Sequence, residues 1–174
     1  MLSAVNRSRR ACRSAVLAVA LTISSIVGAS AETWQIYQND RYGTTIEYPG
    51  IFRPGEPPDN DDGLSFTSSD GASFSVFASY NAFDFDLAGY EDFVVKDLKA
   101  DKVITYRAHG RDWFIISGTK GADQVFYQRY LLSHGGEMTE GFVMAYPSRL
   151  KQKYDPIVAR MAKSLRSGKG FQSP

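Results

Sequence analysis

The sequence predicts an α+β domain in which an antiparallel sheet is flanked by helices. Strand-like runs recur after residue 33 and are joined by short turns of Asn, Asp and Gly, the pattern of antiparallel connections. Two other stretches place apolar residues at steps of three and four, which is the period of a helix. Strands in the second half of the chain are apolar on both faces, which indicates a sheet covered from both sides.

The first half of the domain is predicted to contain a strand pair followed by a hairpin. The expected strands are Trp34–Gln38, Thr44–Tyr48, Leu64–Thr67 and Ala72–Tyr80. Between the two pairs lies Pro49–Gly63, which holds four of the chain's seven prolines. Because proline fixes φ and lacks an N–H donor, this stretch is predicted to be a stiff surface loop without a strand.

The second half is predicted to contain a helix, a four-strand meander and a final helix. Asp86 is the expected N-cap of a helix over residues 87–98. The last helix lies near Ser148–Leu165, and because Pro156 suits only a first turn, we expect its main part to begin with Asp155 as cap. The expected meander strands are Val103–Ala108, Trp113–Gly118, Gln124–Leu132 and Met138–Tyr146.

Several motifs resemble those of small exported alphaproteobacterial proteins of unknown function with a Mog1/PsbP-like fold. The resemblance begins with Asn39-x-Arg41-Tyr42-Gly43-x-x-Ile46-x-Tyr48-Pro49 and continues through the segments 104–107, 112–119 and 146–147. It implies the same order of strands and helices over most of residues 34–165. Proteins of this fold serve as binding or assembly factors and are not generally enzymes, so the resemblance implies a partner more than a reaction.

The first 31 residues have the pattern of an export signal. Four arginines precede an apolar run from Ala15 to Val27, and the stretch closes on Ala29-Ser30-Ala31, a sequence that signal peptidase accepts. We expect cleavage after Ala31, a single domain over 32–166 and a flexible tail over 167–174. The protein would then be periplasmic or secreted. Arg9-Arg10 leaves the twin-arginine route open beside the general one.

Cleavage would change the bulk properties of the chain. It would remove the only cysteine, Cys12, so the mature domain would have no disulfide. Sixteen Lys and Arg would then face 19 Asp and Glu, a formal charge of −3. A mildly acidic domain has no electrostatic reason to bind nucleic acid. We likewise expect no membrane contact after cleavage.

No motif for catalysis, metal binding or a cofactor stands out. The loop from Asp59 to Gly63 fails the register of a calcium site. His109 and His134 lie beside turn glycines and lack enough neighbouring ligands for zinc. There is no Gly-x-Ser-x-Gly elbow, although Ser117 could expose a hydroxyl at a strand end. We therefore expect no catalytic residue, no metal and no cofactor.

The polar residues of the meander are the candidates for binding. Arg107 lies on one face of its strand, and Tyr127 and Arg129 lie together on one face of theirs. If these faces coincide, the three residues, with Tyr106 nearby, form a surface able to bind a carboxylate, phosphate or carbonyl group. Alternatively, the arginines pair with acidic neighbours at the sheet edge.

The sequence therefore favours a non-catalytic binding or accessory domain for an envelope protein or a small ligand. The Pro49–Gly63 loop is a further surface candidate. Phe83-Asp84-Phe85 either tucks under the first helix or projects toward a partner. Two alternatives remain: a hydrolase of unrecognised type built on His109 or His134, and a peripheral membrane protein that uses the basic C-terminal helix.

Overall fold

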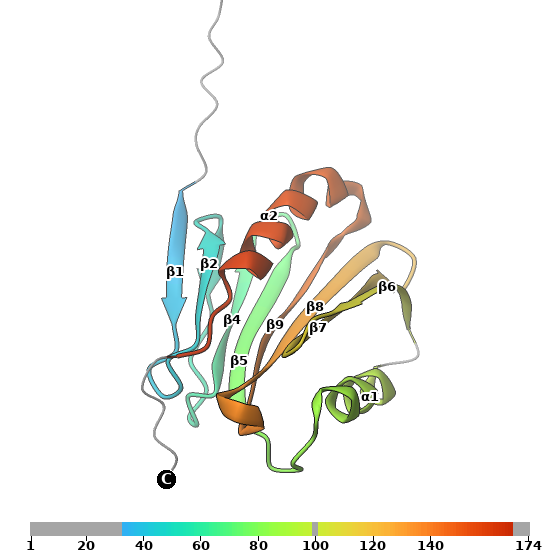
Figure 1. Ribbon diagram of the computed structural model, residues 1–174. Helices are drawn as coiled ribbons and strands as arrows, with labels where there is room; N and C mark the ends of the chain where they lie inside the picture. Colours follow the sequence, from blue (N-terminus) through green and yellow to red (C-terminus); the bar gives the residue numbers. More distant parts are fainter. Residues whose placement is uncertain (1–32, 99–100, 169–174) are drawn as a thin grey trace, which may run out of the picture. The chain divides into compact units, whose positions relative to one another are not determined.

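The computed structural model describes residues 33–98 and 101–168 (Figure 1). The predicted export signal with Cys12, its cleavage point and residues 169–174 lie outside the described part. The strands are β1 (Trp34–Gln38), β2 (Thr45–Pro49), β3 (Phe52–Pro54), β4 (Gly63–Ser68), β5 (Ser73–Tyr80), β6 (Lys102–His109), β7 (Trp113–Lys120), β8 (Gln124–Ser133) and β9 (Met138–Pro147), and the helices are α1 (Leu87–Asp97) and α2 (Lys151–Ser164).

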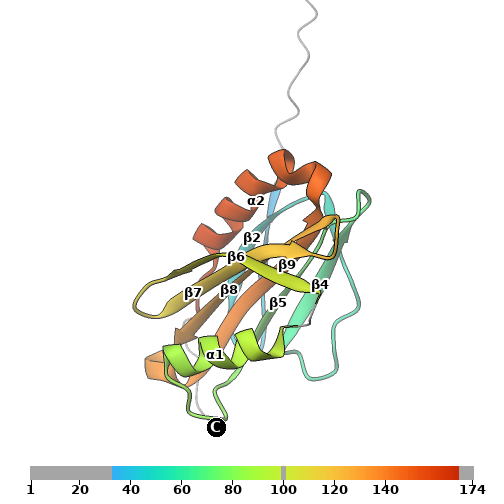
Figure 2. The ribbon, with the colours of Figure 1, turned by 90° about the vertical axis from the view of Figure 1, so that its right-hand side faces the viewer.

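Seven strands form one antiparallel sheet in the order β3-β4-β5-β9-β8-β7-β6, and β1 and β2 form a separate two-stranded sheet. The predicted meander is present as β6 to β9, in which each strand pairs with the next. Strand β9 also pairs with β5, which joins the meander to the earlier hairpin. The two helices lie on opposite faces of the large sheet (Figures 1 and 2), so the predicted α+β architecture is confirmed.

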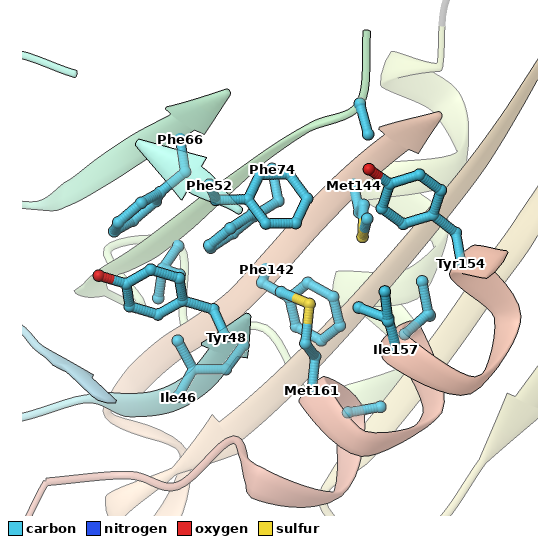
Figure 3. Packing of buried hydrophobic residues seen from close by; sticks show 14 of the residues in the cluster. Ile46, Tyr48, Phe52, Phe66, Phe74, Phe142, Met144, Tyr154, Ile157 and Met161 are labelled. Carbon is cyan, nitrogen blue, oxygen red and sulfur yellow. The ribbon is translucent and has the colours of Figure 1, made fainter. Parts of the chain in front are cut away.

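The larger core lies between one face of the sheet, helix α2 and the β1–β2 hairpin (Figure 3). Phe142, Met144 and Tyr146 of β9 face this core, because the side chains of a strand alternate between its two faces. The rings of Phe66 and Phe74 stack with their centroids 4.4 Å apart. From α2, Tyr154 and Met161 enter the same cluster and are fully buried.

Helix α1 covers the other face with a smaller core. Asp86 is its N-cap, as predicted, and its carboxylate accepts a hydrogen bond of 2.8 Å from the amide of Gly89. Tyr90 and Val94 are the buried residues of this helix. They pack against a cluster on the sheet that contains Phe114, Ile116 and Tyr130. Phe114 and Ile116 of β7 are fully buried under α1, and Ile115 on the opposite face of this apolar run is 7% exposed.

The prediction that Pro49–Gly63 contains no strand is wrong at Phe52–Pro54. These residues form β3, which pairs antiparallel with β4 at the end of the sheet. Pro54 is tolerated because β3 is an edge strand, where a missing N–H need not remove a ladder hydrogen bond. Phe52 is 2% exposed and belongs to the larger core, so burial of its ring outweighs the local signal for a loop.

The predicted start of the last helix at Asp155 is also wrong. Helix α2 begins at Lys151 and includes Pro156. The Asp155 carboxylate caps nothing: it accepts a hydrogen bond of 2.9 Å from the Tyr146 hydroxyl and forms an ion pair with Lys151. Pro156 removes only the bond to the carbonyl of Gln152, which lies in the exposed first turn of the helix.

The segment after α2 is part of the fold. Arg166 pairs with Thr45 of β2 through two backbone hydrogen bonds of 3.0 and 2.9 Å. Ser167 and Gly168 fall within the predicted tail, yet Ser167 is hydrogen-bonded to Glu140 and Gly168 is buried. The ordered part of the domain therefore reaches beyond residue 166.

Candidate functional site

A β-bulge in β6 determines which residues reach the candidate site. The register between β6 and β7 pairs Ile104 with Gly118 and Tyr106 with Ser117, so Thr105 is an extra residue. Because side chains alternate between faces, one inserted residue reverses the orientation of everything after it. Tyr106 consequently lies on the face covered by α2, and Arg107 lies on the face covered by α1.

The four predicted binding residues therefore do not form one surface. The Arg107 guanidinium lies 3.6 Å from the Glu91 carboxylate of α1. Tyr127 and Arg129 are on the other face, because Tyr127 is paired with Ser117 and Arg129 with Ile115. The predicted Arg/Tyr surface is thus corrected: the structure removes Arg107 from it. No residue pattern in the sequence indicates the bulge that separates them.

Tyr106 and Tyr127 instead line a cleft between α2 and strands β6, β7 and β8. The cleft has a volume of about 580 Å³ and mostly apolar walls. Tyr106 is 55% exposed at its open side. The lining residues are Thr105, Tyr106, Ile115, Ser117, Gly118, Thr119, Val125, Tyr127, Tyr146, Ser148, Lys151, Asp155, Val158 and Ala159. This cleft exists because α2 lies over β9 and leaves the outer strands of the same face uncovered.

The polar groups of the cleft largely satisfy one another. The Ser117 hydroxyl donates a hydrogen bond of 2.7 Å to the carbonyl of Phe126, so it is engaged within the sheet. Lys151 and Asp155 form an ion pair at the α2 side. Burial raises the pKa of Tyr127 to about 12, although the charge of Arg129 acts in the opposite direction. The Tyr127 hydroxyl is therefore neutral near pH 7 and can donate a hydrogen bond to a ligand.

Arg129 is the one charged candidate that lies beside the cleft without an ion pair among the described residues. Its guanidinium lies over the Trp113 ring, 4.7 Å from the ring centroid. Its Nε atom is buried and has no hydrogen-bond partner within the described ranges. Burial lowers the pKa of Arg129, and the charge of Arg166 acts in the same direction, whereas Tyr127 and the Asp112 carboxylate raise it. A guanidinium in this situation is stabilised by an anionic partner.

The fold has counterparts among solved structures. The cyanobacterial PsbP protein CyanoP from Synechocystis matches with a TM-score of 0.60 at 13% identity, and the match covers 83% of this chain and 98% of that chain. The chain has a Mog1/PsbP-like fold. The Ran-binding protein Mog1p of Saccharomyces cerevisiae matches with a TM-score of 0.57 at 11% identity, covering 78% of this chain and 96% of that chain. A mutant of Mog1 gives 0.57 at 12% identity, covering 79% of this chain and 97% of that chain.

No family model matches this Mog1/PsbP-like chain, and no curated protein matches it in sequence. Identities of this size show a shared fold alone. Residue roles in the cleft consequently have to be argued from its own geometry.

A buried polar cluster lies elsewhere in the Mog1/PsbP-like domain, around Glu140 of β9. The Ser167 hydroxyl donates to Glu140 at 3.1 Å and lies 2.9 Å from His134 Nε2. Burial raises the pKa of Glu140, while the hydroxyls of Ser167, Thr44 and Ser133 and the nearby His134 act in the opposite direction. A catalytic triad has its base between the nucleophile and the carboxylate. Here the hydroxyl lies between histidine and carboxylate, which is a different arrangement.

Sequence reasoning did not identify Glu140, although the sequence held a signal. Glu140 shares its strand face with Phe142 and Met144, both core residues, and is itself fully buried. A charged residue on the same strand face as buried apolar residues is uncommon. The other histidine, His109, pairs with Phe114 at the end of β6 and is exposed. Within the described residues, no three His, Asp or Glu side chains converge closely enough for a metal ion.

Two basic side chains of α2 are paired with acidic groups of the β-hairpins. Lys153 lies 2.7 Å from Asp70, and Arg160 lies 2.7 Å from Glu47. The Arg160 guanidinium also lies 3.9 Å from the Trp34 ring centroid. These pairs hold the helix against the hairpins. No helix in the described part of the chain is both long and apolar enough to cross a bilayer.

Proposed function

We propose that this protein is an exported, non-catalytic binding module whose cleft holds a small amphipathic anion. The apolar body of the ligand would lie between α2 and strands β6 to β8, and its carboxylate or similar head group would reach Arg129. The observation that carries the proposal is an apolar cleft close to a partly buried guanidinium whose Nε atom has no hydrogen-bond partner among the described residues.

The dimensions and lining of the cleft support this proposal. Its volume of about 580 Å³ lies within the range of about 300–1,000 Å³ typical of small-molecule sites. Such sites combine apolar walls with a few polar groups that orient the ligand. Arg129 follows Tyr127 by two residues on the same strand face and is paired with Ile115 of β7. Tyr127 and Ile115 both line the cleft, so Arg129 lies on the strand face next to it, with its guanidinium over Trp113.

The absence of an assembled catalytic group in the cleft supports a binding role. Ser117, the hydroxyl that could have acted as a nucleophile, donates to a backbone carbonyl and has no histidine beside it among the cleft residues. Lys151 and Asp155 form an ion pair with each other. The export and periplasmic location belong to the proposal and rest on the sequence of residues 1–31.

Calorimetric titration with dodecanoate and with dodecanol tests the proposal, because the two probes share a chain and differ in head-group charge. Dodecanoate is expected to bind more tightly. Arg129→Met should weaken dodecanoate binding by about 10- to 100-fold, the usual value of a charged hydrogen bond, and should leave dodecanol unchanged. Arg53→Met, at an exposed position on β3, removes the same charge far from the cleft and serves as the control.

A second pair of variants tests the location. Ala159 lines the cleft and is exposed, so Ala159→Trp should fill the mouth without disturbing the core. Gln152→Trp places the same ring on an exposed α2 position that does not line the cleft. The proposal would be supported if Ala159→Trp bound neither dodecanoate nor dodecanol while Gln152→Trp still bound both. Equal binding in both variants would contradict it.

A further inference from the structure

Three phenylalanines form an exposed cluster on the face of the sheet that α1 covers. Phe83 is 73% exposed and Phe93 of α1 is 46% exposed. Their ring centroids lie 6.1 Å apart, and each lies within 5.5 Å of the Phe85 ring. We call Phe83, Phe85 and Phe93 the Phe83 surface. Of the two orientations that the sequence left open, Phe83 projects outward and Phe85 is half-buried.

The exposure of Phe83 is imposed by its loop. The buried Asn81 side chain donates 2.8 Å hydrogen bonds to the carbonyls of Phe85 and Gly136 and accepts one from the Phe85 amide. Asp84 has a φ of 52°, a left-handed conformation that is uncommon outside glycine. These constraints order the backbone on both sides of Phe83. A pre-organised apolar group binds a partner at a lower entropic cost.

The surroundings of the Phe83 surface are acidic. Residues 81–97 contain five Asp and Glu and one base, Lys96. Glu91 is paired with Arg107, whereas Asp84, Asp86 and Asp92 are exposed. A hollow of about 460 Å³ adjoins the cluster, and its lining includes Asp84, Asp86 and Glu137 together with Arg111. A surface of apolar rings next to carboxylates is complementary to a partner surface of apolar side chains next to cationic ones.

We propose that the Phe83 surface docks a segment of a partner protein that carries apolar side chains interspersed with Lys or Arg. Charge favours this occupant over an anionic membrane, which the exposed carboxylates would repel. The surface is on the opposite side of the sheet from the cleft, so the docking site is separate from the proposed ligand site. The domain would then bind a ligand on one face and a protein on the other.

Chemical-shift mapping with a synthetic amphipathic helical peptide of Leu and Lys tests the proposal, and a Leu and Glu peptide of equal length is the charge control. The Leu–Lys peptide should shift the amide signals of residues 81–97 and leave those of the cleft unchanged. Phe83→Ser should weaken its binding at least tenfold. Ile36→Ser is the matched control, because Ile36 is 72% exposed on β1. It should leave binding unchanged.

A double variant tests the contribution of the carboxylates to peptide binding. Asp84→Asn with Asp92→Asn removes two carboxylates, and asparagine also adopts the left-handed conformation of residue 84. Binding should weaken and depend less on salt. Equal binding of the Leu–Glu peptide, shifts confined to the cleft, or an unaltered Phe83→Ser variant would each overturn the proposal. Self-association, or binding to phosphatidylglycerol vesicles, that Phe83→Ser abolishes would also overturn it in favour of a different occupant.

Discussion

Tyr90 is expected to hold helix α1 on the sheet, and its removal should release that helix while the sheet stays folded. Tyr90 is 8% exposed, and its ring makes edge-to-face contacts with Phe114 and Tyr130 at centroid distances of 5.5 Å each. Truncating a buried aromatic residue to alanine costs about 3–5 kcal/mol. Val94 is the other buried residue of α1, and Leu87 and Val95 pack on the same cluster only partly buried, so Tyr90→Ala removes the largest buried contact of the helix.

Native-state amide hydrogen exchange measures this effect element by element. In the unaltered protein, α1 amides should open at a lower free energy than those of β8 and β9, because the core under α1 is much the smaller of the two. In Tyr90→Ala, protection of α1 should fall by about 100-fold or more, since 1.4 kcal/mol corresponds to tenfold. The amides of β8 and β9 should retain substantial protection. Binding at the Phe83 surface should weaken, because α1 carries Phe93.

Phe93→Ala is the control, because it removes a ring from α1 at a position that is 46% exposed. It should change α1 protection far less than Tyr90→Ala does. The reasoning is refuted if α1 and β9 amides share a single opening free energy in the unaltered protein. That result would mean that the two cores unfold as one cooperative unit.

Three further predictions concern stability, and urea unfolding measures each of them. Burial opposes ionisation of the Asp70 carboxyl. The hydrogen bonds that it accepts, of which the one from Lys153 has the largest effect, nevertheless hold its pKa below the ordinary 3.8. Asp70→Asn should therefore cost about 1–3 kcal/mol near pH 6, and the difference from the unaltered protein should shrink as pH falls below about 4. Burial raises the pKa of Glu140 above the ordinary 4.5. The unaltered protein should accordingly lose stability relative to Glu140→Gln as pH rises from 4 to 7, and equal pH profiles would contradict this. In Gly118→Ala, the new Cβ would lie 1.9 Å from the carbonyl oxygen of Val103. We expect β6 to be displaced at a cost of about 3 kcal/mol or more, and unchanged stability would show that the strand adapts freely.

Much of the fold was predictable because it depends on local patterns. Turns of Asn, Asp and Gly defined the hairpins, and the N-cap Asp86 followed from its side chain and its place before an apolar period of three and four. The run from Trp113 to Ile116 is apolar on both faces of its strand, which indicated that elements pack on both faces of the sheet. The failures at Phe52 and Pro156 arise where burial of a neighbouring aromatic cluster outweighs the local preference of proline.

The candidate site was predictable only in part. The sequence identified Tyr106, Tyr127 and Arg129 as residues of interest. The structure places the two tyrosines in the cleft and Arg129 on the same strand face as Tyr127, outside the cleft lining. The sequence also suggested Arg107, which the bulge at Thr105 turns to the other face. Binary alternation cannot reveal an inserted residue, because the partner strand determines where the ladder is interrupted.

The sequence by itself determined the α+β class, the two amphipathic helices, and the order of the helices and of every strand except β3. Each of these follows from side-chain periodicity and turn chemistry within a few residues. Tertiary structure alone decided the position of α2 over β9, the cleft that it leaves beside β6 to β8, and the outward orientation of Phe83. These features depend on contacts between segments far apart in the chain. The hydrogen bond of Asn81 to the carbonyl of Gly136, 55 residues further along the chain, is one such case.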